Sequence, residues 1–131
     1  MSGLCIGIDG ACWLNRRGYG RYTRNLLAAL ARRGDGDRYL LFVDPETAAQ
    51  PDIPPQMQRV VVATSRPPAL AASARGRRGL PDLWRMARAV AHQPVHVFFF
   101  PSASTFFPLL RAVPTIVTIH DVIAERHNTD I

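Results

Sequence analysis

Short runs of apolar residues alternate along the chain with amphipathic and polar stretches. Runs that are continuously apolar are typical of strands buried on both faces of a sheet. We predict strands at Leu4 to Ile8, Arg38 to Asp44, Arg59 to Ala63, Val95 to Phe100 and Thr115 to Ile119. Between them, apolar positions recur at helical spacing in two stretches. One predicted helix begins near residues 19–21 and ends before Gly34, and the other runs from Asp82 to His92.

The remaining segments have the composition of connections. Pro45 to Gln58 is rich in Pro, Gln and Ala and shows no period, and residues 105–110 are expected to form a short helix or turn. Residues 64–80, rich in Pro, Ala, Gly and Arg, are predicted to be a flexible loop. Strands that alternate with helices predict an α/β fold: a Rossmann-like, doubly wound parallel sheet in a single domain, residues 1–131.

In such a sheet, ligands bind at the carboxyl ends of the strands. Asp9, Ser102 and the pair His120 and Asp121 each follow a predicted strand. We therefore expect these residues to lie along one edge and to form a candidate cleft. Simpler roles are also open: Asp9 can cap the turn after its strand, His120 can be an ordinary loop residue, and Asp121 can cap a helix.

A loop rich in Arg and Gly lies between the first strand and the first helix. The first N–H groups of a helix lack internal partners, and the macrodipole places partial positive charge there. Arg16, Arg17 and Arg21 add charge around Gly18 and Gly20. The sequence therefore predicts a phosphate-bearing ligand at this loop, although Arg16 and Arg17 fit an ordinary surface loop equally well. Further along the helix, Tyr22 is expected in the core, and Arg24, Arg32 and Arg33 on its solvated face.

The loop does not match a dinucleotide-binding fingerprint. Gly18 and Gly20 give only the first two glycines of that pattern, because Thr23 stands where the third would fall. They also lie well beyond the strand, whereas the fingerprint turn follows the strand directly. We do not expect NAD binding.

Composition sets wider limits. The net charge is +6, and every one of the 16 basic residues is Arg. This charge permits attraction to phosphates or anionic lipid without choosing between them, so it is a weak argument for nucleic acid. We expect neither a membrane-spanning helix nor a secretory signal. Cys5 and Cys12 have no metal or redox spacing and fit reduced, buried thiols in a cytoplasmic protein.

Three stretches together resemble the N-terminal domain of family-four glycosyltransferases, the retaining GT-B enzymes that use nucleotide sugars. They are IGIDG at Ile6 to Gly10, RRGYGRYTRNLLAAL at Arg16 to Leu30, and PTIVTIHDVI at Pro114 to Ile123. A fourth stretch, FFPS at Phe99 to Ser102, matches the family more weakly. The sequence departs from the family at Gly10-Ala11, where members often carry Arg, and at Phe99, where many carry His. These departures concern acceptor contacts rather than the fold.

The resemblance implies a role for each motif. Gly18, Tyr19, Gly20 and Arg21 would lie against the donor diphosphate, and His120 with Asp121 would face the donor sugar and the acceptor. Asp9, Arg16, Arg17 and Ser102 are further candidate cleft contacts. The implied ligands are a nucleotide-diphosphate sugar and a glycan or lipid-linked acceptor. No metal and no other cofactor is expected.

The resemblance also implies a second, C-terminal domain that completes the donor site. We expect the N-terminal domain alone to be inactive or nearly so, and to self-associate through its exposed cleft edge. Arg75, Arg77 and Arg78, with the helix at Asp82 to His92, form either a flexible loop and a core-packed helix or a dock for anionic lipid at the inner face of the membrane. The competing function is a standalone basic module that binds nucleotide or nucleic acid.

Overall fold

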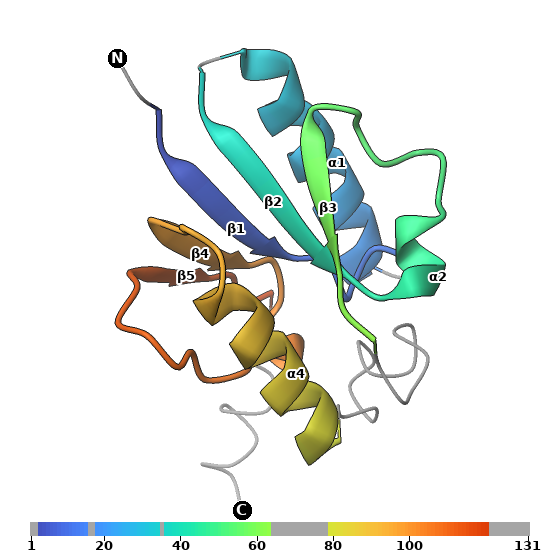
Figure 1. Cartoon of the computed structure of the whole chain (residues 1–131). Coiled ribbons are helices and arrows are strands. Elements are labelled where there is room, and N and C mark those ends of the chain that lie inside the picture. Colours follow the sequence, from blue (N-terminus) through green and yellow to red (C-terminus); the bar gives the residue numbers. More distant parts are fainter. Residues whose placement is uncertain (1–2, 16–17, 35, 64–78, 121–131) are drawn as a thin grey trace, which may run out of the picture.

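The computed structural model describes residues 3–15, 18–34, 36–63 and 79–120 of the chain. Five parallel strands form one sheet in the order β3-β2-β1-β4-β5 (Figure 1). The strands are β1 (Cys5–Asp9), β2 (Arg38–Val43), β3 (Met57–Val61), β4 (Val97–Phe100) and β5 (Thr115–Val117). This arrangement confirms the predicted α/β fold with a Rossmann-like parallel sheet.

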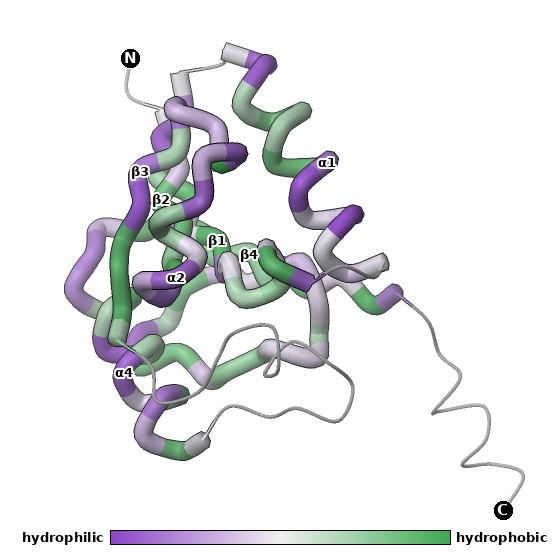
Figure 2. Tube along the Cα trace, turned by 90° about the vertical axis from the view of Figure 1, so that its right-hand side faces the viewer, coloured by the Kyte–Doolittle hydropathy of each residue, from purple (hydrophilic) through white to green (hydrophobic). Residues whose placement is uncertain are grey.

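The two long helices cover opposite faces of the sheet. Helix α1 (Gly18–Arg33) packs on one face and α4 (Leu80–Ala91) on the other, and the two lie on opposite sides of the strands in Figure 2. Each helix closes its own apolar cluster. On the α1 side, Ile8, Leu27 and Leu41 are fully buried, and on the α4 side Phe98, Phe100 and Phe107 pack ring against ring. The central strand β1 thus has buried residues on both faces, as its continuous apolar run predicted.

Helix α1 ends as its sequence predicted. Gly34 follows the last helical residue and has a φ of 60°, a left-handed conformation that glycine adopts without steric cost. Arg32 and Arg33 in the last turn are exposed and complement the negative end of the helix dipole.

Several predicted boundaries were wrong. The segment predicted as a connection contains a short helix, α2 (Pro45–Ala48), which begins there because Asp44 accepts hydrogen bonds from the backbone N–H groups of Glu46 and Thr47. Strand β3 begins at Met57 rather than Arg59, since buried Met57 already pairs with Tyr39. Strand β4 begins at Val97 rather than Val95, and β5 ends at Val117 rather than Ile119.

The loop predicted at residues 64–80 and the turn predicted at residues 105–110 also have different bounds in the structure. Residues 64–78 lie outside the described residues, but Leu80 already belongs to α4, because Pro81 suits the first turn of a helix. Residues 106–110 are irregular, and the turn lies earlier, as a 3-10 helix, η1 (Ala103–Thr105). Within the described ranges, no helix is both long and apolar enough to cross a membrane.

Candidate functional site

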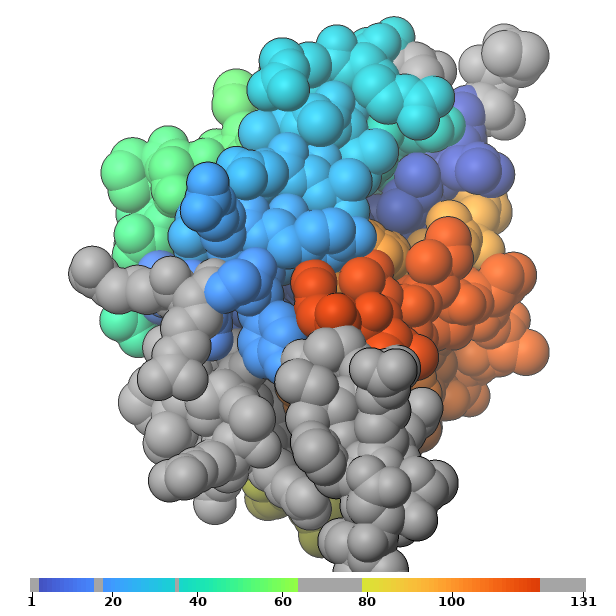
Figure 3. Space-filling model, turned by 180° about the vertical axis from the view of Figure 1, so that it is seen from behind, coloured from blue at the N-terminus to red at the C-terminus, as the bar shows by residue number. Residues whose placement is uncertain are grey.

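The start of α1 meets the segment that follows β5 at the carboxyl edge of the sheet. Seen from behind, the first turn of α1 in blue lies against the last described residues in red (Figure 3). The hydroxyl of Tyr22 on α1 lies 3.1 Å from that of Thr118. The rings of Tyr19 and Tyr22 lie 4.9 and 4.7 Å from the ring of His120, centre to centre. The edge therefore brings together two predicted motifs from opposite ends of the chain.

His120 is fixed at this edge by a backbone group as well. Its Nε2 lies 2.7 Å from the carbonyl oxygen of Pro101, the residue that follows β4. The side chain is half-buried and contacts Tyr19 and Tyr22 on one helix and Pro101 on the neighbouring strand connection. Tyr22 was predicted only as a core residue, and its ring in fact forms part of the surroundings of His120. Aromatic residues three positions apart on a helix, Tyr19 and Tyr22, were the available signal.

Asp9 connects two loops rather than projecting into an open cleft. It is 1% exposed. One carboxylate oxygen accepts a hydrogen bond of 2.6 Å from the Thr105 hydroxyl, and the other accepts one of 3.2 Å from the backbone N–H of Ala11. The second bond is the turn-capping contact that the sequence left open as the simpler role. Asp9 therefore fixes η1 and the loop after β1 in the same place.

Ser102 is also engaged by the protein. It is 2% exposed, and its hydroxyl oxygen accepts from the backbone N–H of Ser104 and bonds the Ser104 hydroxyl at 2.7 Å. Ser102 thereby caps η1, which orients the connection that carries Pro101 past His120.

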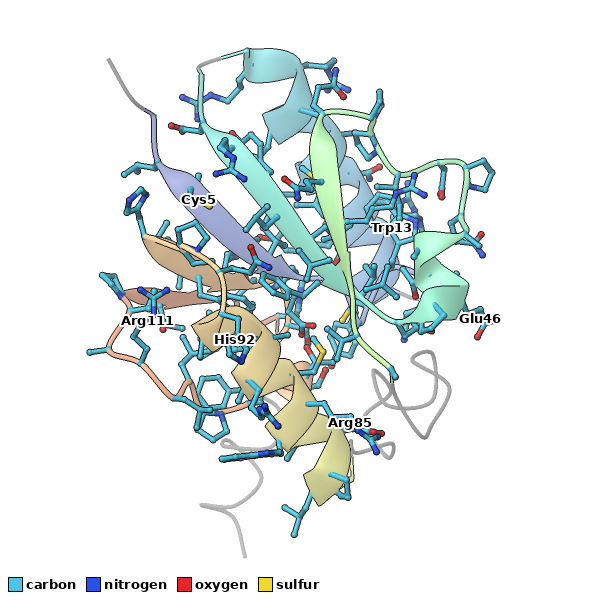
Figure 4. All side chains as sticks on the ribbon, viewed as in Figure 1. Cys5, Trp13, Glu46, Arg85, His92 and Arg111 are labelled. Carbon is cyan, nitrogen blue, oxygen red and sulfur yellow. The ribbon has the colours of Figure 1, made fainter. Side chains whose placement is uncertain are left out.

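The loop between β1 and α1 is braced by Arg24. One guanidinium nitrogen, Nη1, donates to the carbonyl oxygens of Trp13 at 2.7 Å and Asn15 at 2.9 Å. Trp13 is buried, and its indole N–H donates to Asp52 at 2.9 Å, beside α2 (Figure 4). The prediction that Arg24 lies on a solvated face was wrong, because this loop folds back over the first turns of α1.

The two glycines of the loop have different surroundings. A Cβ at Gly20 would lie 1.8 Å from the carbonyl oxygen of Asn15, so this glycine lets the loop approach the helix. Gly18 is exposed, and no described atom outside its chain neighbours lies within 4 Å of a Cβ built there. With respect to the described residues, a side chain at Gly18 would therefore meet no close neighbour, whereas one at Gly20 would meet the loop.

The remaining predicted site residues are only partly described. Arg21 is exposed on the first turn of α1, which contains no acidic residue. Arg16, Arg17 and Asp121 lie outside the described residues. Over the described part of the chain, no group of three or more His, Cys, Asp or Glu side chains is arranged to hold a metal ion.

This edge offers two kinds of chemistry. The first backbone N–H groups of α1 and the Arg21 guanidinium favour an anion, with the helix dipole adding to their effect. His120 adds a ring that donates or accepts hydrogen bonds near neutral pH. The two are adjacent, because Tyr19 belongs to the first turn of α1 and contacts His120.

Comparison with known proteins identifies the family. The model of the glycosyl transferase 4-like domain matches residues 17–130, a range that includes α1, every later strand and His120. No curated protein and no solved structure matches the chain. The sheet, the loop at α1 and the matched range agree with the N-terminal half of a GT-B fold. The chain therefore belongs to the glycosyl transferase 4-like domain family.

Proposed function

We propose that this domain contributes to the transfer of a sugar from a nucleotide-diphosphate donor to a glycan or lipid-linked acceptor. The observation that carries the proposal is the contact between the first turn of α1 and His120, through Tyr19 and Tyr22. This contact puts the N-terminus of α1, where an anion would be favoured, next to a side chain able to bind hydroxyl groups. A nucleotide sugar has both chemistries on adjacent atoms: a diphosphate and a hydroxylated ring.

The donor diphosphate would bind at the N-terminus of α1. Among the described residues beyond its chain neighbours, none comes within 4 Å of a Cβ built at Gly18, so none of them blocks the approach of a phosphate oxygen to this part of the backbone. Arg21 is exposed on the same turn and can form paired hydrogen bonds to phosphate. These groups would also stabilise the negative charge on the leaving nucleoside diphosphate. We expect no metal cofactor, because Arg21 and the helix terminus supply positive charge.

His120 would bind the sugar or acceptor hydroxyls, with Asp121 beside it. A histidine at this place can orient a hydroxyl or move a proton. Family members combine this half with a second domain, and we propose that sugar transfer by this chain also depends on one.

Donor binding and transfer test the proposal together. Calorimetry with a panel of nucleotide-diphosphate sugars, and transfer assays with a C-terminal domain supplied, should both give signals that weaken in Arg21→Ala and His120→Ala. Arg32→Ala is the matched control, since Arg32 lies on the same helix at its far end and is exposed. An Arg21→Ala loss of about tenfold in affinity corresponds to one charge-assisted contact.

The contrary results are distinct from one another. Absence of both binding and transfer with every donor would exclude the enzyme. Tight binding to DNA or RNA, with affinity that falls steeply as salt increases, would instead favour a basic nucleic-acid-binding module.

We further propose that α4 carries the domain to an anionic membrane surface on the cytoplasmic side. Leu80 and Trp84 are 80% and 55% exposed, and Arg88 is exposed on the same helix. Arg85, labelled on α4 in Figure 4, is exposed for half its side chain although it pairs with Asp82 at 2.9 Å. Apolar and cationic groups on one short helix suit the interface of an anionic bilayer.

Sedimentation with vesicles tests this location. Vesicles containing anionic lipid should bind the protein at low salt, and neutral vesicles should bind it much less. Trp84→Ser should weaken the binding, whereas equal sedimentation with both vesicle types would contradict the electrostatic part of the proposal.

A further inference from the structure

One tautomer of His120 is selected by its backbone contact. The Nε2 atom lies 2.7 Å from the carbonyl oxygen of Pro101. A carbonyl oxygen can only accept a hydrogen bond, so Nε2 must carry the hydrogen. A neutral imidazole has one N–H, and the other nitrogen, Nδ1, is then an acceptor. The nitrogen that remains to accept a hydrogen bond from a ligand is therefore Nδ1.

The ring is also held against rotation. The ring of Tyr22 meets it nearly edge to face, at 4.7 Å with an interplanar angle of 84°, and the ring of Tyr19 meets it at 4.9 Å and 48°. Tyr22 is itself anchored, because its hydroxyl lies 3.1 Å from the hydroxyl of Thr118, two residues before His120. A turn of the imidazole that exchanged its two nitrogens would have to displace these contacts.

We propose that Tyr22 and Thr118 are positioning residues that hold His120 as the Nε2–H tautomer, with Nδ1 presented as an acceptor to a substrate hydroxyl. The hydroxyl belongs to the transferred sugar or to the acceptor, and in this respect the inference rests on the proposed function. Neutral His120 accepts a hydrogen bond from the hydroxyl at Nδ1, while Nε2–H donates to the Pro101 carbonyl oxygen.

His96 provides an internal reference for this tautomer. Its Nδ1 accepts a hydrogen bond of 2.8 Å from the backbone N–H of Cys5, at the opposite end of β1 from the site. His96 must therefore also carry its hydrogen on Nε2. The contact with Cys5 is independent of Tyr22 and Thr118.

Nitrogen NMR of the ring tests the tautomer directly. The chain is labelled with ¹⁵N-histidine and observed in alkaline buffer, where imidazole is neutral, and the His120 signals are identified from a His120→Gln variant. We expect His120 to show a protonated Nε2 and an unprotonated Nδ1, like His96. A protonated Nδ1 at His120, or an even mixture of tautomers, would overturn the proposal whether or not the protein transfers sugar.

Variants of the two positioning residues test their part. Tyr22→Leu should move the His120 nitrogen signals toward a mixture of tautomers while the His96 signals stay in place. Tyr22→Phe keeps the ring and loses the hydroxyl anchor, and Thr118→Val loses the same anchor from the other side, so both should give a smaller change in the same direction. Unchanged His120 signals in Tyr22→Leu, with His96 signals at their native positions, would show that Tyr22 does not hold the ring. If Tyr22→Leu does not fold, Thr118→Val and Tyr22→Phe decide the same question.

Kinetics then separates this inference from the proposed function. In the presence of a C-terminal domain, Tyr22→Leu should lower kcat by about tenfold through misplacement of His120, with a smaller effect on the KM of the donor, whose diphosphate binds elsewhere. A native tautomer pattern in a protein that neither binds nor transfers sugar would refute the proposed function alone. Native kcat in a Tyr22→Leu variant with altered tautomers would refute the positioning role alone.

Discussion

Replacement of Gly20 by Ala is the most direct test of the loop at the start of α1. The added Cβ would lie 1.8 Å from the carbonyl oxygen of Asn15 and 2.8 Å from Nη1 of Arg24. Backbone φ at Gly20 is not positive, so the penalty is purely steric. The nearest atom belongs to the backbone, and it must withdraw by more than about 1 Å before ordinary contact is restored.

The magnitude follows from what that withdrawal breaks. Insertion of a methyl group into a closely packed place typically costs about 1–3 kcal/mol. Displacement of Asn15 also weakens its 2.9 Å hydrogen bond from Arg24, and hydrogen bonds to charged groups contribute about 1.5–3 kcal/mol. Alanine recovers about 1 kcal/mol through its higher helix propensity. We expect Gly20→Ala to lower the free energy of unfolding by about 2–4 kcal/mol.

Gly18→Ala is the matched control. It makes the same chemical change two residues earlier, where no described atom lies within 4 Å of the new Cβ. Its free energy of unfolding should stay within about 1 kcal/mol of the native value, on the stabilising side. Urea unfolding followed by circular dichroism measures the free energy of unfolding of both variants. Thermal unfolding measures Tm, which should fall by about 10 °C for Gly20→Ala alone. Native stability in Gly20→Ala would refute the close approach of the loop to the helix.

Four further outcomes are expected. Asp9→Ala should lower the free energy of unfolding by about 2–4 kcal/mol in urea titrations, because the Thr105 hydroxyl and the Ala11 N–H lose a charged acceptor; a loss below that of Thr105→Val would contradict this. Trp13→Phe should lose about 1 kcal/mol through its hydrogen bond to Asp52 in addition to the cost of lost packing, and in an Asp52→Ala background the total cost should be smaller by that amount; an equal cost in both backgrounds would contradict this. Phe98→Ala should cost about 3–5 kcal/mol, since the side chain is fully buried among Phe42, Phe100 and Phe107, and native stability by calorimetry would refute that packing. Self-association at the site edge should fall in Ile119→Asp, whose native side chain is 62% exposed beside His120, and a concentration-independent monomer mass of the native chain in light scattering would contradict it.

The sheet could be predicted because its strands are short, apolar and separated by helices. Continuous apolar runs such as that before Asp9 leave few alternatives to a buried parallel strand. Several boundaries were predicted wrongly, because they depend on contacts between segments that are distant in the sequence. Strand β3 extends back to Met57 because Met57 finds Tyr39 beside it, and no local signal in the Pro- and Gln-rich segment indicates that partner.

The site could be predicted in outline but not in detail. The prediction of a parallel sheet implied that residues after β1, β4 and β5 would share an edge, and Asp9, Ser102 and His120 do. The sequence did not reveal that Asp9 is buried against Thr105, because this contact joins positions 96 residues apart. Arg24 was misjudged for a similar reason: an arginine on a helix surface gives no sign of the loop that will cover it.

The central position of β1 determines how the edge must assemble. At the start of β1, the hydrogen bond from Leu4 to Asp37, next to β2, joins residues 33 positions apart. The hydrogen bond from Cys5 to His96, next to β4, joins residues 91 positions apart. Closing a longer loop costs more chain entropy, and such contacts form late in folding. Tyr22 and Thr118 are 96 residues apart, so the surroundings of His120 should form late in folding. The loop between β1 and α1 joins neighbouring segments and should form early. A folding intermediate with β1, α1 and β2 in place would therefore contain the first turn of α1 before it could position His120.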